Sequence, residues 1–267
     1  IYLKLATDLR AKNKLPRFGG YDSLECEAEC IAIAVESPEQ VEAIFLTTPF
    51  YGESGGQAGD RGRISGAGFE AEVLDVQRPV PELIVAHLKP LKGKIAVGTQ
   101  YLQQTDRAVR GLIARNHTAT HMLHWALREV LGKHVKQSGS LVTSELLRFD
   151  FAHFQPMTEE ELTRVEDLIN ERIWSDATVA KREMGKDEAI KAGAIAFFGE
   201  KYGDRVRVVS VGDFSTELCG GTHVDHAGEI NLFKIISESG IAAGVRRVVA
   251  QTSRGAFEHL RKRDTEI

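Results

Sequence analysis

This sequence has little cysteine, no long apolar run and no excess of basic residues, and each of these features excludes a class of protein. The three cysteines, Cys26, Cys30 and Cys219, are too few for the disulfide framework of a small secreted domain. No apolar run approaches the ~20 residues that a membrane-spanning helix needs. The 34 basic residues are outnumbered by 38 acidic ones, so any contact with nucleic acid must use local patches.

The chain also lacks an initial methionine and a secretion signal. It begins at Ile1, and its opening stretch, IYLKLATDLRAKNKLP, is amphipathic rather than charged and then apolar. We therefore expect a fragment of a longer protein or a processed start. The low cysteine content fits a reducing cytoplasm. At 267 residues and 42% hydrophobic content, the sequence fits a soluble globular protein of one large or two smaller domains.

Residues 19–104 carry the pattern of short β-strands. Runs such as QVEAIFLTT and ELIVAHLK are separated by turns rich in Gly and Pro, and no helical period appears, which predicts a small β-barrel. Cys26 and Cys30 alternate with glutamates, so a strand holds them roughly 13 Å apart and they cannot share one metal ion. We expect inert, buried thiols. The stretch TPFYGESGGQAGDRG, residues 48–62, is predicted to be a loop whose glycines allow close backbone approach.

Helical and strand-like segments alternate after the predicted barrel, which makes the whole chain α+β. One helix is expected over HTATHMLHWALREVLG, capped by Asn116 and ended by Gly132. A second is expected over TEEELTRVEDLINERIW, where Thr158 and Glu161 form a capping box. A short helix is predicted over KDEAIKAGAIAFF. Strands are predicted over GSLVTSELLRFDFAHF, ATVAKREM, DRVRVVSVG, EINLFKIISES and GVRRVVAQT.

These patterns divide the chain into four parts. We expect a helical linker remnant over residues 1–18, with its helix ending near Pro16, and the β-barrel over 19–104. An α+β domain with an antiparallel sheet and helices follows over 105–252, and residues 253–267 begin a C-terminal linker helix.

Four histidine and cysteine residues are candidate metal ligands. His117 and His121 are four residues apart on the first predicted long helix, so both imidazoles project from one face, away from the apolar face. Cys219 and His223 have the same spacing in ELCGGTHV, about a hundred residues later. Alone, either pair could be solvated or capping side chains, but together they form a His₃Cys set suited to Zn²⁺. His124 is a further, weaker candidate ligand.

Two families of zinc enzymes are excluded by their motifs. Thr118 occupies the position at which the HExxH motif of zinc peptidases requires glutamate. The PCxxC element of nucleobase deaminases is absent as well.

Several long motifs, in order, resemble the editing domain of bacterial alanyl-tRNA synthetase. These are RNHTATHMLHWALREVLGKHVKQSGSLV, RFDF, FGEKYGDRVRVVSVGDFSTELCGGTHV and ISESGIAAGVRRVVA, and TPFYGESGGQAGDRG is similar to the Gly-rich stretch of the β-barrel that precedes that domain. The resemblance covers about residues 19 to 255. Related domains with the same HxxxH and CxxxH pattern occur in threonyl-tRNA synthetase and in freestanding alanyl-tRNA deacylases.

The resemblance implies hydrolysis of Ser-tRNA(Ala) and Gly-tRNA(Ala) at a Zn²⁺ site. The metal ligands would be His117, His121, Cys219 and His223, and Gln137 falls at the position of a glutamine of the editing pocket. Nothing resembles the class II aminoacylation core or its ATP-binding motifs, and we expect that the oligomerising C-terminal domain of the full synthetase lies outside this sequence. A freestanding deacylase, or a zinc-bearing RNA-binding module without catalysis, are the alternatives.

Such a site must accept serine and spare alanine, so polar groups that bond the serine hydroxyl are expected. The candidates are Gln137, Thr118 and, in the Gly-rich loop, Glu53, Ser54 and Gln57. The metal would either activate a water molecule or position the substrate.

The expected partners are the acceptor end of tRNA(Ala) carrying Ser or Gly and the remainder of the synthetase chain, with no membrane involved. Phosphate contacts would position the acceptor end without reading sequence. The candidate cations are Arg107, Arg110, Arg115, Lys133, Lys136, Arg246 and Arg247.

Overall fold

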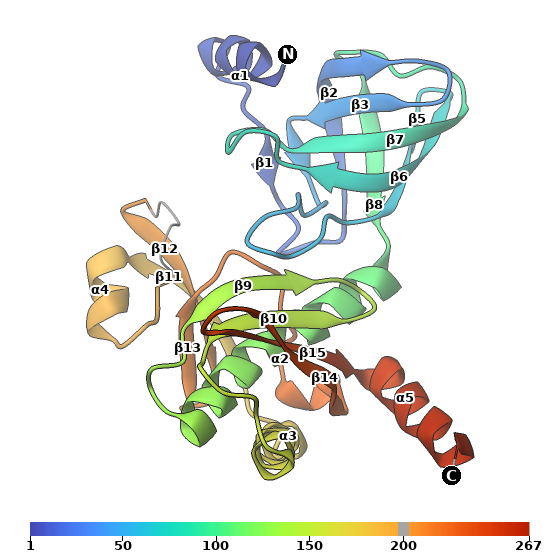
Figure 1. The fold of residues 1–267 in the computed structure, drawn as a ribbon. Coiled ribbons are helices and arrows are strands. Elements are labelled where there is room, and N and C mark those ends of the chain that lie inside the picture. The colour runs from blue at the N-terminus through green and yellow to red at the C-terminus, as the bar shows by residue number, and fades with distance from the viewer. Residues whose placement is uncertain (197–202, 267) are drawn as a thin grey trace. The chain divides into compact units, whose positions relative to one another are not determined.

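A computed structural model describes residues 1–196 and 203–266, which form an α+β fold of two compact units. The first unit comprises residues 1–54 and 58–110, and the second comprises residues 55–57 and 111–267. Figure 1 shows the closed barrel of the first unit and the sheets and helices of the second. None of the helices in the described ranges has the length and apolar character needed to cross a membrane.

The first unit is built around a closed, antiparallel six-stranded barrel, which confirms the barrel predicted from the sequence. Its strands, in sheet order, are β2 (Glu25–Glu36), β3 (Val41–Phe45), β7 (Val85–Lys92), β6 (Phe69–Gln77), β5 (Gly62–Gly66) and β8 (Gln100–Thr105). Alternate side chains of β6 and β8 are buried, so one face of each strand lines the core. Phe45, Phe69 and Tyr101 meet there in edge-to-face contacts.

The N-terminal helix is shorter than expected. Helix α1 covers Tyr2–Ala11, and Asn13 then adopts a positive φ of 53°, a left-handed conformation that ends the helix before Pro16. The chain continues as β1 (Arg17–Phe18), which pairs in parallel with β4 (Thr47–Thr48).

Both cysteines of strand β2 are free thiols, as predicted. Cys30 is buried and Cys26 is half-buried. Burial raises the pKa of both thiols, that of Cys30 to about 12, so neither forms a thiolate near neutral pH.

The second unit contains a four-stranded and a three-stranded antiparallel sheet. The first has the order β14 (Phe233–Ala242), β15 (Val245–Thr252), β10 (Leu147–Ala152) and β9 (Gln137–Val142). The second has the order β11 (Val179–Gly185), β12 (Arg205–Val211) and β13 (Ser215–Leu218). The helices are α2 (Arg107–Leu131), α3 (Glu159–Trp174), α4 (Lys186–Lys191) and α5 (Ser253–Glu266), with a 3-10 turn η1 (Ala227–Ile230). Apolar residues of α2 and α3 and of both sheets share one core.

Helix α2 begins earlier than the sequence suggested. The Asp106 carboxylate accepts hydrogen bonds from the backbone N–H of Ala108 and Val109, so Asp106 caps the helix. Asn116 therefore lies inside α2 and is not its cap. Its side chain instead donates to the Thr143 carbonyl. The predicted end is confirmed, because Gly132 follows the helix with a φ of 113°.

The remaining elements largely follow the predicted pattern. Thr158 and Glu161 form the expected capping box at the start of α3. Strand β13 was missed. The strand predicted from residue 229 begins at Phe233, because η1 precedes it. Helix α4 ends at Lys191, earlier than predicted, and residues 197–198 of that prediction lie outside the described residues.

One buried ion pair organises the first unit. The guanidinium of Arg110 donates to both carboxylate oxygens of Asp60, and also to the carbonyl oxygens of Gly20 and Pro49. Both charged side chains are buried, and the Asp60 carboxylate also accepts from the Tyr51 backbone N–H. The guanidinium of Arg110, which the sequence suggested as an RNA contact, is thus buried and bonded inside the protein.

Removing one partner of this pair should destabilise the first unit strongly. In Arg110→Ala, Asp60 stays buried without its counter-charge, and the free energy of unfolding should fall by about 3–5 kcal/mol. The change is measured by urea denaturation, with hydrogen exchange of the barrel amides as the probe of unfolding. Arg107→Ala, an exposed arginine of the same helix, should change the free energy by less than about 0.5 kcal/mol. Equal effects of the two substitutions would contradict the assignment.

Candidate metal centre

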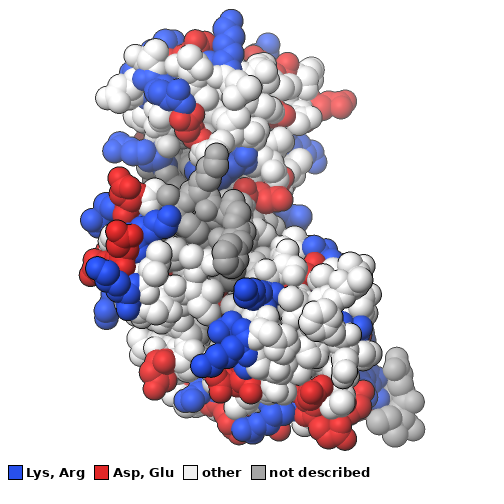
Figure 2. All heavy atoms as spheres, turned by 60° about the vertical axis from the view of Figure 1, so that its left-hand side comes forward, with Lys and Arg blue, Asp and Glu red and all other residues white. Residues whose placement is uncertain are grey.

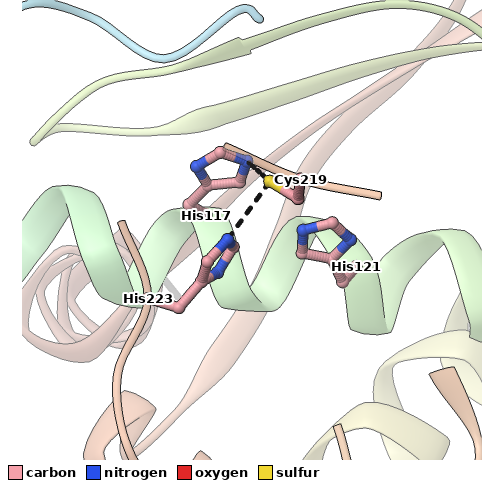
Figure 3. Close-up of side chains that lie close together, drawn as sticks. All are labelled: His117, His121, Cys219 and His223. Atoms are coloured by element: carbon pink, nitrogen blue, oxygen red, sulfur yellow. Dashed lines mark hydrogen bonds between the residues drawn. The ribbon is translucent and has the colours of Figure 1, made fainter. Parts of the chain in front are cut away.

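The four predicted ligands lie close together in the second unit. His117 and His121 project from α2, whereas Cys219 and His223 lie on the segment after β13. Each of the four residues offers one ligand atom, and these four atoms all lie within 4.8 Å of one another. Figure 3 shows the four side chains around one point, with Cys219 Sγ 3.4 Å from His117 Nε2 and 3.3 Å from His223 Nε2. The four residues that the sequence spacing suggested therefore lie together in the structure.

The histidines of α2 lie on a different face from its apolar residues, as predicted, and they are also buried. The opposite, apolar face of the helix is in the core, as predicted, with Leu123 and Leu127 fully buried. His117 and His121 are only 7% and 4% exposed, because the segment after β13 covers them. The helix is therefore enclosed on two faces, one apolar and one polar.

Gly221 allows this segment to approach α2 closely. A Cβ atom at this position would lie 2.0 Å from Cε1 and 2.3 Å from Nδ1 of His117. No side chain fits there without moving the imidazole. The carbonyl oxygens of Cys219 and Gly221 both accept hydrogen bonds from Arg207, which holds the turn in place.

Gln57 orients His117. Its Oε1 accepts a 2.8 Å hydrogen bond from the backbone N–H of Thr222, and its Nε2 donates to Thr222 Oγ1, so the orientation of the amide is fixed. The same Oε1 lies 2.7 Å from His117 Nδ1, which must therefore carry the proton. The lone pair of His117 is left on Nε2, the atom that faces Cys219.

Thr118 has the equivalent role for His223. Its hydroxyl donates to the Ala114 carbonyl oxygen, so it accepts from His223 Nδ1 at 3.1 Å and from the Val224 N–H. The proton of His223 lies on Nδ1, and its Nε2 lone pair faces the centre. Thr118 and Gln57 thus contact the ligand imidazoles, which assigns both a positioning role.

Glu217 orients the third imidazole, and no sequence motif pointed to it. One carboxylate oxygen accepts from His121 Nδ1, and the other accepts from His124 Nδ1 at 2.6 Å. His124, considered from the sequence as a ligand, is instead the second imidazole on this carboxylate. His121 Nε2 is buried and has no hydrogen-bond partner within the described part of the chain. Alternation along β13 could have indicated that Glu217 points inward, but not its partners.

The centre carries negative charge. Burial alone would raise the pKa of Cys219, but the surrounding imidazoles outweigh it and hold the pKa well below its usual value. Burial likewise opposes ionisation of Glu217, yet His121 and His124 lower its pKa to about 2. Burial lowers the pKa of His223 to about 3. Burial also lowers the pKa of His121, but the negative charges of Glu217 and Cys219 outweigh this effect and raise its pKa to about 10. A thiolate and a carboxylate thus favour a cation at this point.

The donor set fits a zinc ion. Three imidazole Nε2 atoms and a thiolate converge on one point, and a cation between them would be bound by all four. A tetrahedral Zn²⁺ ion with Zn–N of about 2.0 Å and Zn–S of about 2.3 Å would separate N and S ligands by about 3.5 Å, close to the separations found. Each Nδ1 is also held by a hydrogen bond, as in metal sites generally.

The other predicted pocket residues lie elsewhere. Gln137 begins β9, where its Nε2 donates to Ser140 Oγ at 3.2 Å. Glu53 and Ser54 belong to the first unit, in which Glu53 accepts from Gln77 and the Ser54 carbonyl oxygen accepts from Tyr51. The structure therefore brings Gln57 and Thr118 to the candidate metal ligands, whereas Glu53 and Ser54 belong to the first unit.

The predicted RNA-binding cations differ in their exposure and in the contacts that hold them. Arg246 and Arg247 form bidentate ion pairs with Glu238 and Asp150 on the four-stranded sheet. Arg115 donates to the carbonyl oxygen of Glu229. Arg107, Lys133 and Lys136 are exposed. On the face shown in Figure 2, basic and acidic residues are intermixed, in keeping with the net charge of −4.

Two parts of the chain match families of aminoacyl-tRNA synthetase domains. Residues 206–249, which include β13 and both Cys219 and His223, match the family model described as threonyl and alanyl tRNA synthetase second additional domain. Residues 4–109, the barrel unit, match the model described as tRNA synthetases class II (A). The class II match was not anticipated from motifs, and the residues that it covers form α1 and the barrel.

Alanine–tRNA ligases from three bacteria are similar to this chain. The ligase of Myxococcus xanthus is 49% identical over 100% of the chain, that of Carboxydothermus hydrogenoformans 49% over 91%, and that of Fusobacterium nucleatum 48% over 92%. The chain belongs to the alanyl-tRNA synthetase family. It spans about a third of the length of these relatives, 31%, 29% and 28% respectively.

Filling the space at Gly221 should disrupt the centre. In Gly221→Ala the new methyl group displaces the His117 ring and breaks its hydrogen bond with Gln57, so zinc affinity should fall at least about tenfold. Competition with a chromophoric chelator measures the affinity. Gly111→Ala on α2 is the matched control, because the atom nearest to its Cβ is the flexible Arg115 Nη1 at 3.6 Å. Unchanged affinity in Gly221→Ala would contradict this geometry.

Glu217→Gln should weaken zinc binding without unfolding the protein. His121 and His124 bond to different oxygens of the carboxylate, and glutamine replaces one of these oxygens with an NH₂ donor, so the His121 tautomer is no longer enforced. We expect zinc affinity to fall about 10–100-fold. The visible spectrum of the Co²⁺ derivative should change as well. Glu183→Gln, a substitution at an exposed position on β11, should change neither the zinc affinity nor the Co²⁺ spectrum. If Glu217→Gln matched this control in both measurements, the positioning role of Glu217 would be refuted.

Proposed function

We propose that the chain is the editing part of an alanyl-tRNA synthetase, a hydrolase of the ester bond in Ser-tRNA(Ala) and Gly-tRNA(Ala). The observation that carries the proposal is the convergence of three oriented Nε2 atoms and one thiolate within the second unit, part of which matches the family's second additional domain. The remainder of the synthetase and the acceptor end of tRNA(Ala) are the proposed partners, with the cytoplasm as the compartment.

The chemistry of alanine selection explains why such a site is needed. A pocket for alanine cannot exclude glycine by size, and an apolar pocket rejects an added hydroxyl group only about 10²-fold. Both amino acids therefore reach the tRNA, and a second site must remove them. The relatives are named as alanine–tRNA ligases, which supports this substrate class.

His117, His121, Cys219 and His223 would hold Zn²⁺, with Gln57, Thr118 and Glu217 as positioning residues. When bound, zinc supplies a positive charge that can polarise or anchor the aminoacyl group. The protein residues hold the three Nε2 atoms directed inward, and the burial of His117 and His121 limits the access of bulk water. Gln137, at the start of β9, would bind the serine hydroxyl group.

A second candidate function is a zinc-stabilised RNA-binding module without catalysis. It is favoured by the presence of four protein ligands, since closed sets of four are typical of structural zinc. In this case zinc removal would unfold the second unit, and no ester would be hydrolysed.

Hydrolysis and zinc content together distinguish the two functions. The wild-type chain should deacylate Ser-tRNA(Ala) well above the buffer rate, and Cys219→Ala should lose zinc and most of this activity. Gln137→Ala should keep its zinc, because the Gln137 amide bonds to Ser140 and not to the ligands, yet deacylate Ser-tRNA(Ala) at least about tenfold more slowly. Metal content by mass spectrometry and release of labelled serine are the measurements. Zinc-loaded wild-type protein without activity would refute the hydrolase and support the module.

A further inference from the structure

A row of stacked rings leads from the core of the second unit to its surface. Phe149, Phe151 and His153 follow one another at every second residue, so they share one face of β10 and its extension. Successive rings are nearly parallel, with interplanar angles of 24° and 28° and centroids 6.2 and 6.3 Å apart. His134 continues the row, 5.3 Å from His153 at 26°. Phe149 and Phe151 are fully buried, whereas His134 is exposed.

The surface end of this row is held rigidly. The guanidinium of Arg128 donates to the carbonyl oxygens of Lys133 and Val135, and the Val135 side chain is fully buried. His134 Nε2 and His153 Nδ1 are 3.0 Å apart, so one donates to the other. The loop after α2 is therefore held through its backbone by Arg128 and through the side-chain contact of His134 with His153. This contact fixes the orientation of the His134 ring.

A second exposed ring lies beside this end. Phe154 is 88% exposed, the highest value among the large hydrophobic residues of the described chain. It follows His153, whose backbone N–H donates to the Gly244 carbonyl oxygen. The Phe154 ring lies against Gly244, where a Cβ atom would be 3.3 Å from its Cε1. One side of the ring is thus supported by backbone and the remainder is open to solvent.

Two lysines accompany the exposed rings. Lys133 precedes His134, and the carbonyl oxygen of Lys136 accepts from the backbone N–H of Ala152, which places Lys136 next to the end of β10. Both lysines are exposed. Rings with an open face beside exposed cations are the combination by which proteins bind single-stranded nucleic acid, since bases stack and phosphates pair with the cations.

We propose that His134 and Phe154, with Lys133 and Lys136, form a stacking platform for the unpaired 3′ end of an RNA. The inference rests on the proposed function and specifies where its substrate is held. Gln137 directly follows Lys136 and pairs with Phe151 across β9 and β10, so the platform adjoins the residue proposed to bind the serine hydroxyl group. Bases stacked on the platform would hold the strand next to that residue.

The platform is tested by binding of RNA without an amino acid. The probe is a labelled RNA hairpin with a short unpaired 3′ end, and its affinity for the full chain is measured by fluorescence anisotropy. Phe154→Ala and His134→Ala should each weaken binding about tenfold, whereas Phe154→Trp should bind like the wild type. Replacing Lys133 and Lys136 by alanine should reduce the slope of log affinity against log salt by about 0.7 for each phosphate that is no longer neutralised.

The controls separate stacking from general surface effects. Phe257→Ala on α5, also an exposed phenylalanine, should leave the affinity unchanged. The same hairpin with a blunt end should bind the wild type and Phe154→Ala equally. Wild-type affinity in both Phe154→Ala and His134→Ala, or an equal weakening for the blunt hairpin, would overturn the proposal. Because the probe carries no ester, failure of the hydrolase proposal would leave these results intact.

Discussion

The second unit depends on one constraint: three imidazole rings must each present a lone pair to the same point as a thiolate. Left to themselves, imidazoles exchange tautomers and rotate. Here each Nδ1 proton is held by a different acceptor, the Gln57 amide, the Thr118 hydroxyl and the Glu217 carboxylate. These acceptors belong to a loop, a helix and a strand, so the centre joins elements that are far apart in sequence. The backbone of all three elements must therefore be in place before the imidazoles can take the orientations that a metal ion would need.

The constraint also explains two local choices in the sequence. Glycine at 221 is required because the chain must pass against the His117 ring, which leaves no room for a Cβ atom. Threonine suits position 118 of the helix, since its hydroxyl donates to the Ala114 carbonyl and can then only accept. A glutamate there, as in zinc peptidases, would add a further negative charge to a centre that already holds a thiolate and the Glu217 carboxylate.

The parts that could be predicted from sequence are those set by local geometry. His117 and His121 share a face because a helix repeats every 3.6 residues, and the barrel strands follow from alternation. The start of α2 was misplaced because two residues, Asp106 and Asn116, could both cap a helix, and only the tertiary contact of Asn116 with Thr143 decides between them. The role of Glu217 and the burial of Arg110 were not foreseen for the same reason: burial and partners depend on packing between distant segments.

Counting hydrogen bonds narrows the choice of residue for substrate selection. Thr118 Oγ1 donates once and accepts from both His223 and Val224, so it has no capacity left for a serine hydroxyl group. The Gln57 oxygen accepts twice, and its amide is fixed by Thr222. Gln137 donates to Ser140 through Nε2, which leaves its carbonyl oxygen able to accept a hydrogen bond. Under the proposed function, discrimination between serine and alanine would therefore rest on Gln137, while Thr118 and Gln57 serve the metal ligands.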